Sequence, residues 1–167
     1  MGVKLQESVG EAAESRCFSG NLAWLLYKAH WALASELTAG LAPLGVSARG
    51  YHVLRAALSG AHTQTELAEM VGLDKTTMVV TVDALEAAGL AERRPSSHDR
   101  RARVVAVTKV GESKVREAEV ILERVRDDVL EALDPAERKP FLNALRQLAG
   151  GRLADPVPCA HSVRRRV

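Results

Sequence analysis

Residues 63–108 read TQTELAEMVGLDKTTMVVTVDALEAAGLAERRPSSHDRRARVVAVT. The stretch opens on Thr63 with a glutamate three residues later, a capping box in which each side chain can bond the other residue's backbone amide at a helix start. Gly72 predicts the end of this short helix, and Asp74 predicts the cap of a second helix that runs to about Ala88. Two helices joined through a glycine turn are typical of a helix-turn-helix.

A basic hairpin is predicted directly after the second helix. Residues 90–94 and 103–107 have the composition of two short strands, and the polar segment 95–100 joins them. Between Glu92 and Arg103, five arginines against two acidic residues give a local charge of +3. Helix, turn, helix and basic hairpin in this order predict a winged helix-turn-helix, whose second helix enters the DNA major groove.

Amphipathic helices are predicted on both sides of this lobe. Apolar residues at three- and four-residue steps predict a long helix over 11–41, and Ser47 can cap a second helix. After the hairpin, Thr108 can cap a helix that runs to about Leu133, and its alternating apolar steps are of the kind that pack against another helix. Asp134, followed by a proline, predicts the start of the last helix.

The predicted fold is therefore mainly α with one small β-hairpin, in the order α-α-α-α-β-β-α-α. The 167 residues are 47% hydrophobic, 26% charged and 4% aromatic, values that suit one soluble domain and exclude collagen-like, disulfide-scaffold and mostly disordered chains. Two cysteines are too few for a disulfide framework, and no stretch is apolar enough to span a bilayer. We expect a cytoplasmic protein that does not associate with membranes.

The net charge of +2 conceals an uneven distribution. The hairpin and the C-terminal tail, residues 151–167, each carry +3, so the remaining residues together carry −4. Arginines of the hairpin can neutralise phosphates or enter the minor groove. The sequence has no nucleophile elbow, phosphate loop or metal-ligand spacing, so we expect neither an enzyme nor a bound cofactor or metal ion.

Three segments, 64–77, 82–95 and 99–108, resemble the MarR family of bacterial transcriptional regulators. The resemblance extends from about Trp24 to Leu148. It implies an obligate homodimer whose two winged lobes read a pseudo-palindromic operator, most often as a repressor. The implied domains are an N-terminal dimerisation helix (11–45), a winged helix-turn-helix DNA-binding lobe (47–108), C-terminal dimerisation helices (109–150) and a disordered basic tail (151–167).

The expected partner is double-stranded DNA, met by the starts of the two central helices and by the hairpin. Short hydroxyls and a cation at the start of the second helix can reach phosphates and base edges, and a valine there can meet a thymine methyl group. The expected DNA-binding residues are Thr63, Gln64, Thr65, Asp74, Lys75, Thr76, Thr77, Val80, Thr81, Arg93, Arg94, Ser96, Ser97, His98, Arg100 and Arg101.

The resemblance also implies a bridge between the second helix and the hairpin. Asp83 and Arg101 match an aspartate and a wing arginine that pair in the family, and such a pair would hold the wing at a fixed angle to the helix. The sequence departs from the family at Val80 and Ala84, where many members carry a long polar residue. This departure shifts the expected DNA contacts toward the helix start and the wing.

MarR-like proteins commonly release DNA when a small, often aromatic or phenolic, ligand binds between the dimerisation domain and the DNA-binding lobe. Both tryptophans and both tyrosines fall in the first two predicted helices, beside histidines and an arginine, a set that suits an aromatic acid. The candidate effector residues are Trp24, Tyr27, His30, Trp31, Tyr51, His52 and Arg55. The alternative for at least half of these side chains is a place in the core or an interface.

Two alternative functions remain open. Cys17 lies near the start of the first predicted helix, as the reactive cysteine of peroxide-sensing family members does, and a helix N-terminus can lower the pKa of a thiol. The other interpretation of Cys17 is an incidental thiol. A helical dimer that uses the wing to bind another protein is the second alternative, and salt-dependent binding to promoter DNA would separate it from a DNA-binding regulator.

Overall fold

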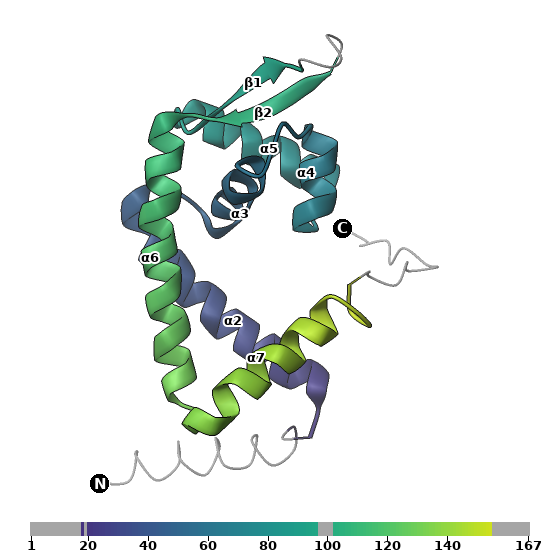
Figure 1. Ribbon diagram of the computed structural model, residues 1–167, viewed down its shortest axis with the longest axis vertical. Coiled ribbons are helices and arrows are strands. Elements are labelled where there is room, and N and C mark those ends of the chain that lie inside the picture. Colours follow the sequence, from purple (N-terminus) through teal and green to yellow (C-terminus); the bar gives the residue numbers. More distant parts are fainter. Residues whose placement is uncertain (1–17, 19, 97–101, 155–167) are drawn as a thin grey trace, which may run out of the picture. The chain divides into compact units, whose positions relative to one another are not determined.

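The computed structural model describes residues 18, 20–96 and 102–154. The chain divides into two compact units, one through Val125 and the other from Arg126 onward. The order of elements confirms the prediction of a mainly α fold with one antiparallel hairpin. The elements are α2 (Leu22–Leu41), the short 3-10 helix η1 (Ala42–Leu44), α3 (Ala48–Ala57), α4 (Gln64–Val71), α5 (Lys75–Ala87), β1 (Ala91–Pro95), β2 (Arg103–Val107), α6 (Lys109–Glu131) and α7 (Pro135–Ala149) (Figure 1).

Helix α2 begins later than the sequence predicts. Asn21 has an extended backbone, with φ −88° and ψ 101°, and its Oδ1 accepts a hydrogen bond from the amide of Trp24 at 3.0 Å. An asparagine in this conformation starts a helix and does not continue one. The prediction of one uninterrupted helix over 11–41 is therefore wrong at Asn21, and residues 11–17 lie outside the described residues.

The predicted caps of the two central helices are confirmed. The amide of Glu66 donates to Oγ1 of Thr63 at 3.3 Å, and the amide of Thr63 donates back to Oε2 of Glu66 at 2.7 Å. Oδ1 of Asp74 accepts from the amide of Thr77 at 2.9 Å. Gly72 ends α4 with φ +68°, a left-handed conformation that glycine adopts without steric cost. Local hydrogen bonds thus set where α4 and α5 begin.

The hairpin is attached to the segment that precedes α4. Its two strands pair antiparallel, with Arg93 opposite Val105. The amide of Val105 also donates to the carbonyl oxygen of His62 at 2.9 Å, so β2 bonds β1 on one side and the start of α4 on the other. Figure 1 shows the hairpin lying over α5. This attachment places the wing, defined here as β1, β2 and the loop between them, beside both central helices.

One hydrophobic core joins α3, α4, α5, β2 and the first half of α6. Val115 and Ala118 of α6 belong to this core, so that part of the predicted α6 seam packs inside its own chain. Burying a side chain of valine or leucine size contributes roughly 1.5–3 kcal/mol. The largest fully buried side chains are Leu41, Val53, Leu54, Leu67, Met78, Val82 and Val105.

The start of α6 lies against the turn between α5 and β1. The amide of Thr108 donates to the carbonyl oxygen of Leu90 at 3.0 Å, and the Thr108 hydroxyl donates to that of Gly89 at 2.7 Å. A Cβ at position 111 would overlap the carbonyl oxygen of Leu90 and the side chain of Val107. Gly111 therefore permits an approach that no larger residue allows.

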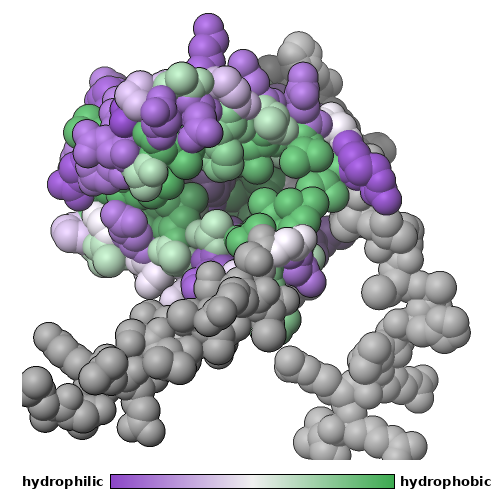
Figure 2. Space-filling view, turned by 90° about the horizontal axis from the view of Figure 1, so that it is seen from below, coloured by the Kyte–Doolittle hydropathy of each residue, from purple (hydrophilic) through white to green (hydrophobic). Residues whose placement is uncertain are grey.

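Apolar side chains remain exposed on the helices that flank the lobe (Figure 2). In the second unit, Asp134 caps α7 and Pro135 occupies its first position, as predicted. No helix in the described ranges is both long and apolar enough to cross a bilayer. The exposed apolar residues are Leu22, Leu25, Tyr27, Trp31 and Leu33 on α2, and Phe141, Leu145 and Leu148 on α7.

Candidate nucleic-acid interface

The first turn of α5 presents a cation and a hydroxyl to solvent. Lys75 and Thr76 are both exposed. Asp74 and Thr77 are bound to each other, because the Thr77 amide and hydroxyl donate to the two carboxylate oxygens of Asp74 at 2.9 and 2.6 Å. These hydrogen bonds hold the pKa of Asp74 below its ordinary value. Asp74 and Thr77 therefore shape the helix start, while Lys75 and Thr76 are available to a partner.

The next turn of α5 separates an exposed face from a buried one. Val79 and Val80 are 46% and 63% exposed, whereas Met78 and Val82 belong to the core. Thr81 is only 9% exposed, and its hydroxyl donates to the carbonyl oxygen of Thr77 at 2.7 Å. The structure therefore places the expected contact Val80 on the surface and Thr81 on the buried face of the helix.

The start of α4 lies next to the start of α5. An open groove between them is lined by Gln64, Thr65 and Ala68 of α4 and by Lys75, Met78 and Val79 of α5. Thr65 is exposed, whereas the hydroxyl of Thr63 donates to Glu66 at 2.9 Å as part of the capping box. The capping bonds from Thr63 lower the pKa of Glu66, so this carboxylate stays charged at neutral pH.

Arg93 on β1 binds residues of both central helices. Its Nε donates to Oε1 of Gln64 on α4 at 2.9 Å, and a terminal nitrogen donates to Oδ1 of Asp83 on α5 at 2.6 Å. The other terminal nitrogen donates to Glu86 on α5, and the Arg93 amide donates to Oε1 of the same Glu86 at 2.6 Å. The side chain of Arg93 is only 24% exposed. All three guanidinium nitrogens of this expected DNA contact are thus used inside the lobe.

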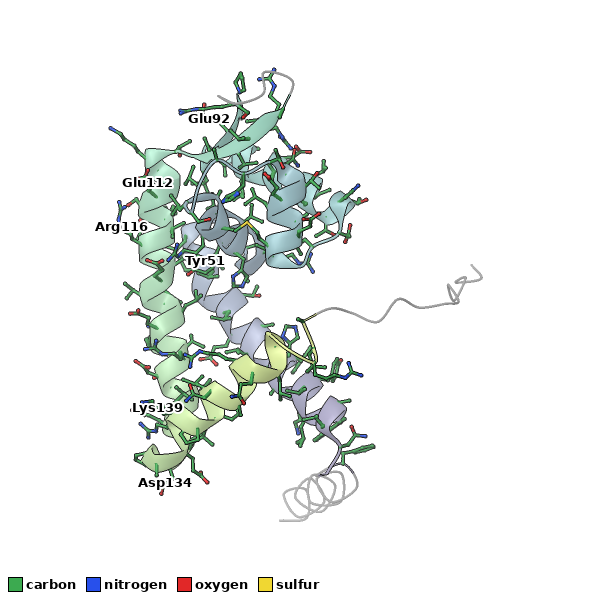
Figure 3. All side chains as sticks on the ribbon, turned by 45° about the vertical axis from the view of Figure 1, so that its right-hand side comes forward. Tyr51, Glu92, Glu112, Arg116, Asp134 and Lys139 are labelled. Atoms are coloured by element: carbon green, nitrogen blue, oxygen red, sulfur yellow. The ribbon has the colours of Figure 1, made fainter. Side chains whose placement is uncertain are left out.

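The neighbouring arginine points outward. Arg94 is 63% exposed and pairs with Glu92 on the same strand. Figure 3 places Glu92 on the hairpin, next to the tip of the wing. The amide of Ser96 donates to the carbonyl oxygen of Ala102 at 3.0 Å, which continues the hairpin by one pair. The remaining wing residues expected at DNA, Ser97, His98, Arg100 and Arg101, lie outside the described residues.

Asp83 has a partner that the sequence analysis did not name. The expected partner, Arg101, lies outside the described residues, and Asp83 bonds Arg93. Gln64 and Glu86 join the same cluster and were also missed. The available signal was the spacing of Asp83 and Glu86, which are three residues apart and so share one face of α5.

The aromatic side chains of α2 are mostly exposed. Phe18 and Trp24 stack with ring centroids 5.4 Å apart, and Nζ of Lys28 lies 4.9 Å from the Trp24 ring centroid, a distance typical of a cation–π contact. Tyr27 and Trp31 are 67% and 66% exposed, and His30 is exposed as well. This set offers aromatic surface and a cation on one helix.

The candidate effector residues of α3 have partners within the chain. Tyr51 is buried in the core, and its burial, together with the carboxylate of Glu119, raises the pKa of its hydroxyl (Figure 3). The ring of His52 meets Tyr51 edge-on at 5.3 Å. Nε of Arg55 lies 3.0 Å from Oε1 of Glu119 on α6. Tyr51 thus takes the core role left open above, and Cys17 lies outside the described residues.

Comparison with protein families gives a match over the lobe. Residues 44–102, which span α3 to the end of the wing loop, match the model of the MarR family. The chain is a MarR-family protein. Within the matched residues lie the capping box, α5 and the Arg93 cluster, so the family pattern covers the elements that build the candidate interface.

Solved structures of MarR-family regulators have the same fold. The transcriptional repressor CouR bound to a 23-mer DNA duplex is 27% identical, with a TM-score of 0.73 over 79% of this chain and 94% of CouR. CouR from Rhodococcus jostii RHA1 bound to p-coumaroyl-CoA gives 25% identity and a TM-score of 0.70 over 84% and 98%. The Mycobacterium tuberculosis MarR family protein Rv2887 in complex with p-aminosalicylic acid gives 26% and 0.65 over 78% and 99%.

Proposed function

We propose that this MarR-family protein is a transcriptional repressor that binds a pseudo-palindromic operator as a homodimer and leaves it when a small aromatic acid binds. The observation that carries the proposal is the first turn of α5. It presents Lys75 and Thr76 to solvent beside the basic wing, in a fold that the DNA-bound repressor CouR shares. A helix that starts with a cation and a hydroxyl can meet phosphates and base edges in the major groove.

Each exposed residue of the interface has a distinct expected contact. Lys75 neutralises a phosphate or bonds a guanine, and Thr76 bonds a base edge or a phosphate oxygen. Val80 meets a thymine methyl group, because an apolar side chain cannot bond the polar base edges. Arg94 turns from Glu92 to a phosphate of the backbone. The few long polar side chains on α5 imply that much of the affinity comes from phosphate contacts.

Homodimer formation is supported by the exposed apolar residues of the flanking helices. Trp31 on α2 and Phe141 on α7 are 66% and 47% exposed in the single chain, and both belong to rows of exposed apolar side chains. Exposed apolar surface of this kind marks a protein interface in most proteins. A two-fold dimer would present two copies of α5 to half-sites about one DNA turn apart, roughly 34 Å.

An aromatic acid is the effector class that fits best. CouR binds p-coumaroyl-CoA and Rv2887 binds p-aminosalicylic acid, both of which are aromatic compounds. On this chain, exposed Tyr27 and Trp31 offer ring surface for stacking, and Lys28 offers a cation for a carboxylate. We place the effector against α2, where these side chains lie.

Fluorescence anisotropy with labelled duplexes from the region upstream of its own gene tests the proposal. The expected result is binding that weakens steeply as salt rises, because phosphate contacts release counterions. Lys75→Ala should weaken binding, and Lys114→Ala, a cation on α6 away from the wing, is the matched control. p-Coumaroyl-CoA and p-aminosalicylate are then titrated into the complex. Release by either compound supports an aromatic effector, and no release by a broad panel of aromatic acids contradicts it.

A further inference from the structure

The Arg93 cluster joins three elements through one side chain. Arg93 comes from β1, Gln64 from the first turn of α4, and Asp83 and Glu86 from the second half of α5. These are the wing and both helices of the helix-turn-helix. The backbone of β1 is held as well, because the Arg93 amide bonds Glu86 at 2.6 Å. The angle between the wing and α5 is therefore set by bonds at both ends of one residue.

We propose that Arg93 is a positioning residue, which fixes the wing against α5 and orients Gln64, and that it does not itself bind DNA phosphate. This inference rests on the proposed DNA-binding function. Its basis is that every guanidinium nitrogen already donates to an acceptor within the lobe. Two carboxylates face a single positive charge, so the cluster as a whole carries −1 and does not attract a phosphate.

Arg94 provides the contrast on the next position of the strand. Successive side chains of a strand point to opposite faces, so Arg94 points away from the helices that bind Arg93. It is 63% exposed and pairs with one carboxylate, that of Glu92, which is itself 45% exposed. An exposed pair of this kind is weak, so a phosphate can displace Glu92. Of these two arginines, Arg94 is the one assigned to DNA.

The orientation of Gln64 gives the cluster a direct consequence at the interface. Arg93 bonds the amide oxygen of Gln64, which fixes the amide nitrogen on the opposite side of the group. That nitrogen is buried and has no hydrogen-bond partner. Gln64 also lines the groove that contains Lys75. Loss of Arg93 would free the amide to rotate and so alter the surface beside the start of α5.

Salt-dependent DNA binding by Arg93→Met and Arg94→Met proteins separates the two roles. A phosphate contact contributes about 0.9 to the slope of log affinity against log salt, so Arg94→Met should lower the slope by about that amount. Arg93→Met should weaken binding about tenfold without lowering the slope, since it removes positioning and no counterion release. A slope that falls by about 0.9 in Arg93→Met, with unchanged hydrogen exchange in the hairpin, would overturn the proposal.

Neutralising single carboxylates gives a second test that does not require Arg93 to be removed. Asp83→Asn makes the lobe more positive, so a phosphate-binding Arg93 would bind DNA more tightly in this variant. A positioning role predicts the opposite, weaker binding, together with faster amide exchange in β1 and β2. Glu92→Gln is the matched control, and it should tighten binding because it frees Arg94. Tighter binding by Asp83→Asn contradicts the proposal.

The hydrogen-exchange measurement keeps the inference separate from the proposed function. If the unmodified protein binds no DNA, the proposed function fails, while exchange in the hairpin still reports whether Arg93 holds the wing. Arg93→Lys is included because a lysine cannot present three directed donors to three acceptors. It should leave exchange in the hairpin nearly as fast as Arg93→Met does. Protection restored fully by lysine would count against the three-way cluster.

Discussion

Arg55 on α3 and Glu119 on α6 form an ion pair, with Nε and Oε1 3.0 Å apart. The sequence predicts Arg55 as the cation of an effector site, so its charge is already met by a carboxylate of the same chain. The two side chains are 56% and 40% exposed, and an exposed pair contributes only about 0–1 kcal/mol to stability. Glu119 is therefore held weakly enough for the carboxylate of a ligand to replace it.

Removing the charge of Glu119 should strengthen effector binding. Glu119→Gln leaves Arg55 without its competing carboxylate, so p-aminosalicylate should bind up to about fivefold more tightly, with little change in thermal stability. Isothermal titration calorimetry measures the affinity. Glu117→Gln is the control, since the carboxylate of Glu117 bonds Lys114 at 2.9 Å and does not meet Arg55. Equal or weaker binding by Glu119→Gln would show that Arg55 does not meet the ligand carboxylate.

A methyl group at position 111 should destabilise the lobe. Gly111→Ala forces a Cβ into the carbonyl oxygen of Leu90 at the point where α6 starts. Overpacking against backbone typically costs about 1–3 kcal/mol, and urea unfolding would measure that loss. Gly20→Ala is the matched control, because a Cβ there meets no atom within 4 Å. Equal stability of the two variants would mean that α6 does not approach the α5–β1 turn this closely.

The cap of α5 should make stability depend on pH in the acid range. Hydrogen bonds from Thr77 hold the pKa of Asp74 below its ordinary value of 3.8. The cap therefore stabilises the fold above the unfolded pKa, and this contribution is lost as pH falls through the lower folded pKa. Asp74→Asn retains a capping oxygen without the charge.

The difference in unfolding free energy between the parent protein and Asp74→Asn measures this contribution. It should be present at pH 7 and shrink toward pH 3. Asp134→Asn serves as a comparison at the start of α7, where the carboxylate accepts a single bond from the amide of Ala136. A constant difference across this range for Asp74→Asn would contradict the assignment.

A charge on the exposed apolar row of α7 should break the proposed homodimer. Leu145→Glu places a carboxylate among apolar side chains, and burying it in an interface is costly unless it is paired. Sedimentation velocity should then show a monomer, and operator binding should weaken because two half-sites no longer act together. Gln147→Glu adds the same charge two residues on, about 200° around the helix, and should leave the dimer intact. A dimeric Leu145→Glu protein would exclude this row from the interface.

Local features of the fold were predictable because their causes are local in sequence. The capping box at Thr63, the cap at Asp74 and the left-handed glycine at Gly72 each depend on residues within one helical turn. The start of α2 was missed for a similar local reason, since the apolar spacing continues across Asn21 while its side chain caps a new helix. Periodicity alone does not distinguish these two outcomes.

The candidate site was only partly predictable because its key contacts are distant in sequence. Arg93 and Gln64 are 29 residues apart and meet only after the hairpin packs on α4. Composition therefore indicated a DNA contact for every hairpin arginine, whereas the fold turns Arg93 inward and Arg94 outward. Thr81 is a similar case, because whether it meets DNA or the core depends on which face of α5 the lobe buries.

Anisotropy of a labelled upstream duplex, compared with a duplex of the same length and scrambled sequence, tests the central claim most directly. The protein as a homodimer should bind the upstream duplex at least about a thousandfold more tightly than the scrambled one at physiological salt. Lys75→Ala should weaken binding and lower the salt slope, as loss of a phosphate contact requires. Equal affinity for the two duplexes, or affinity that does not change with salt, would contradict a sequence-specific regulator that reads DNA through α5 and the wing.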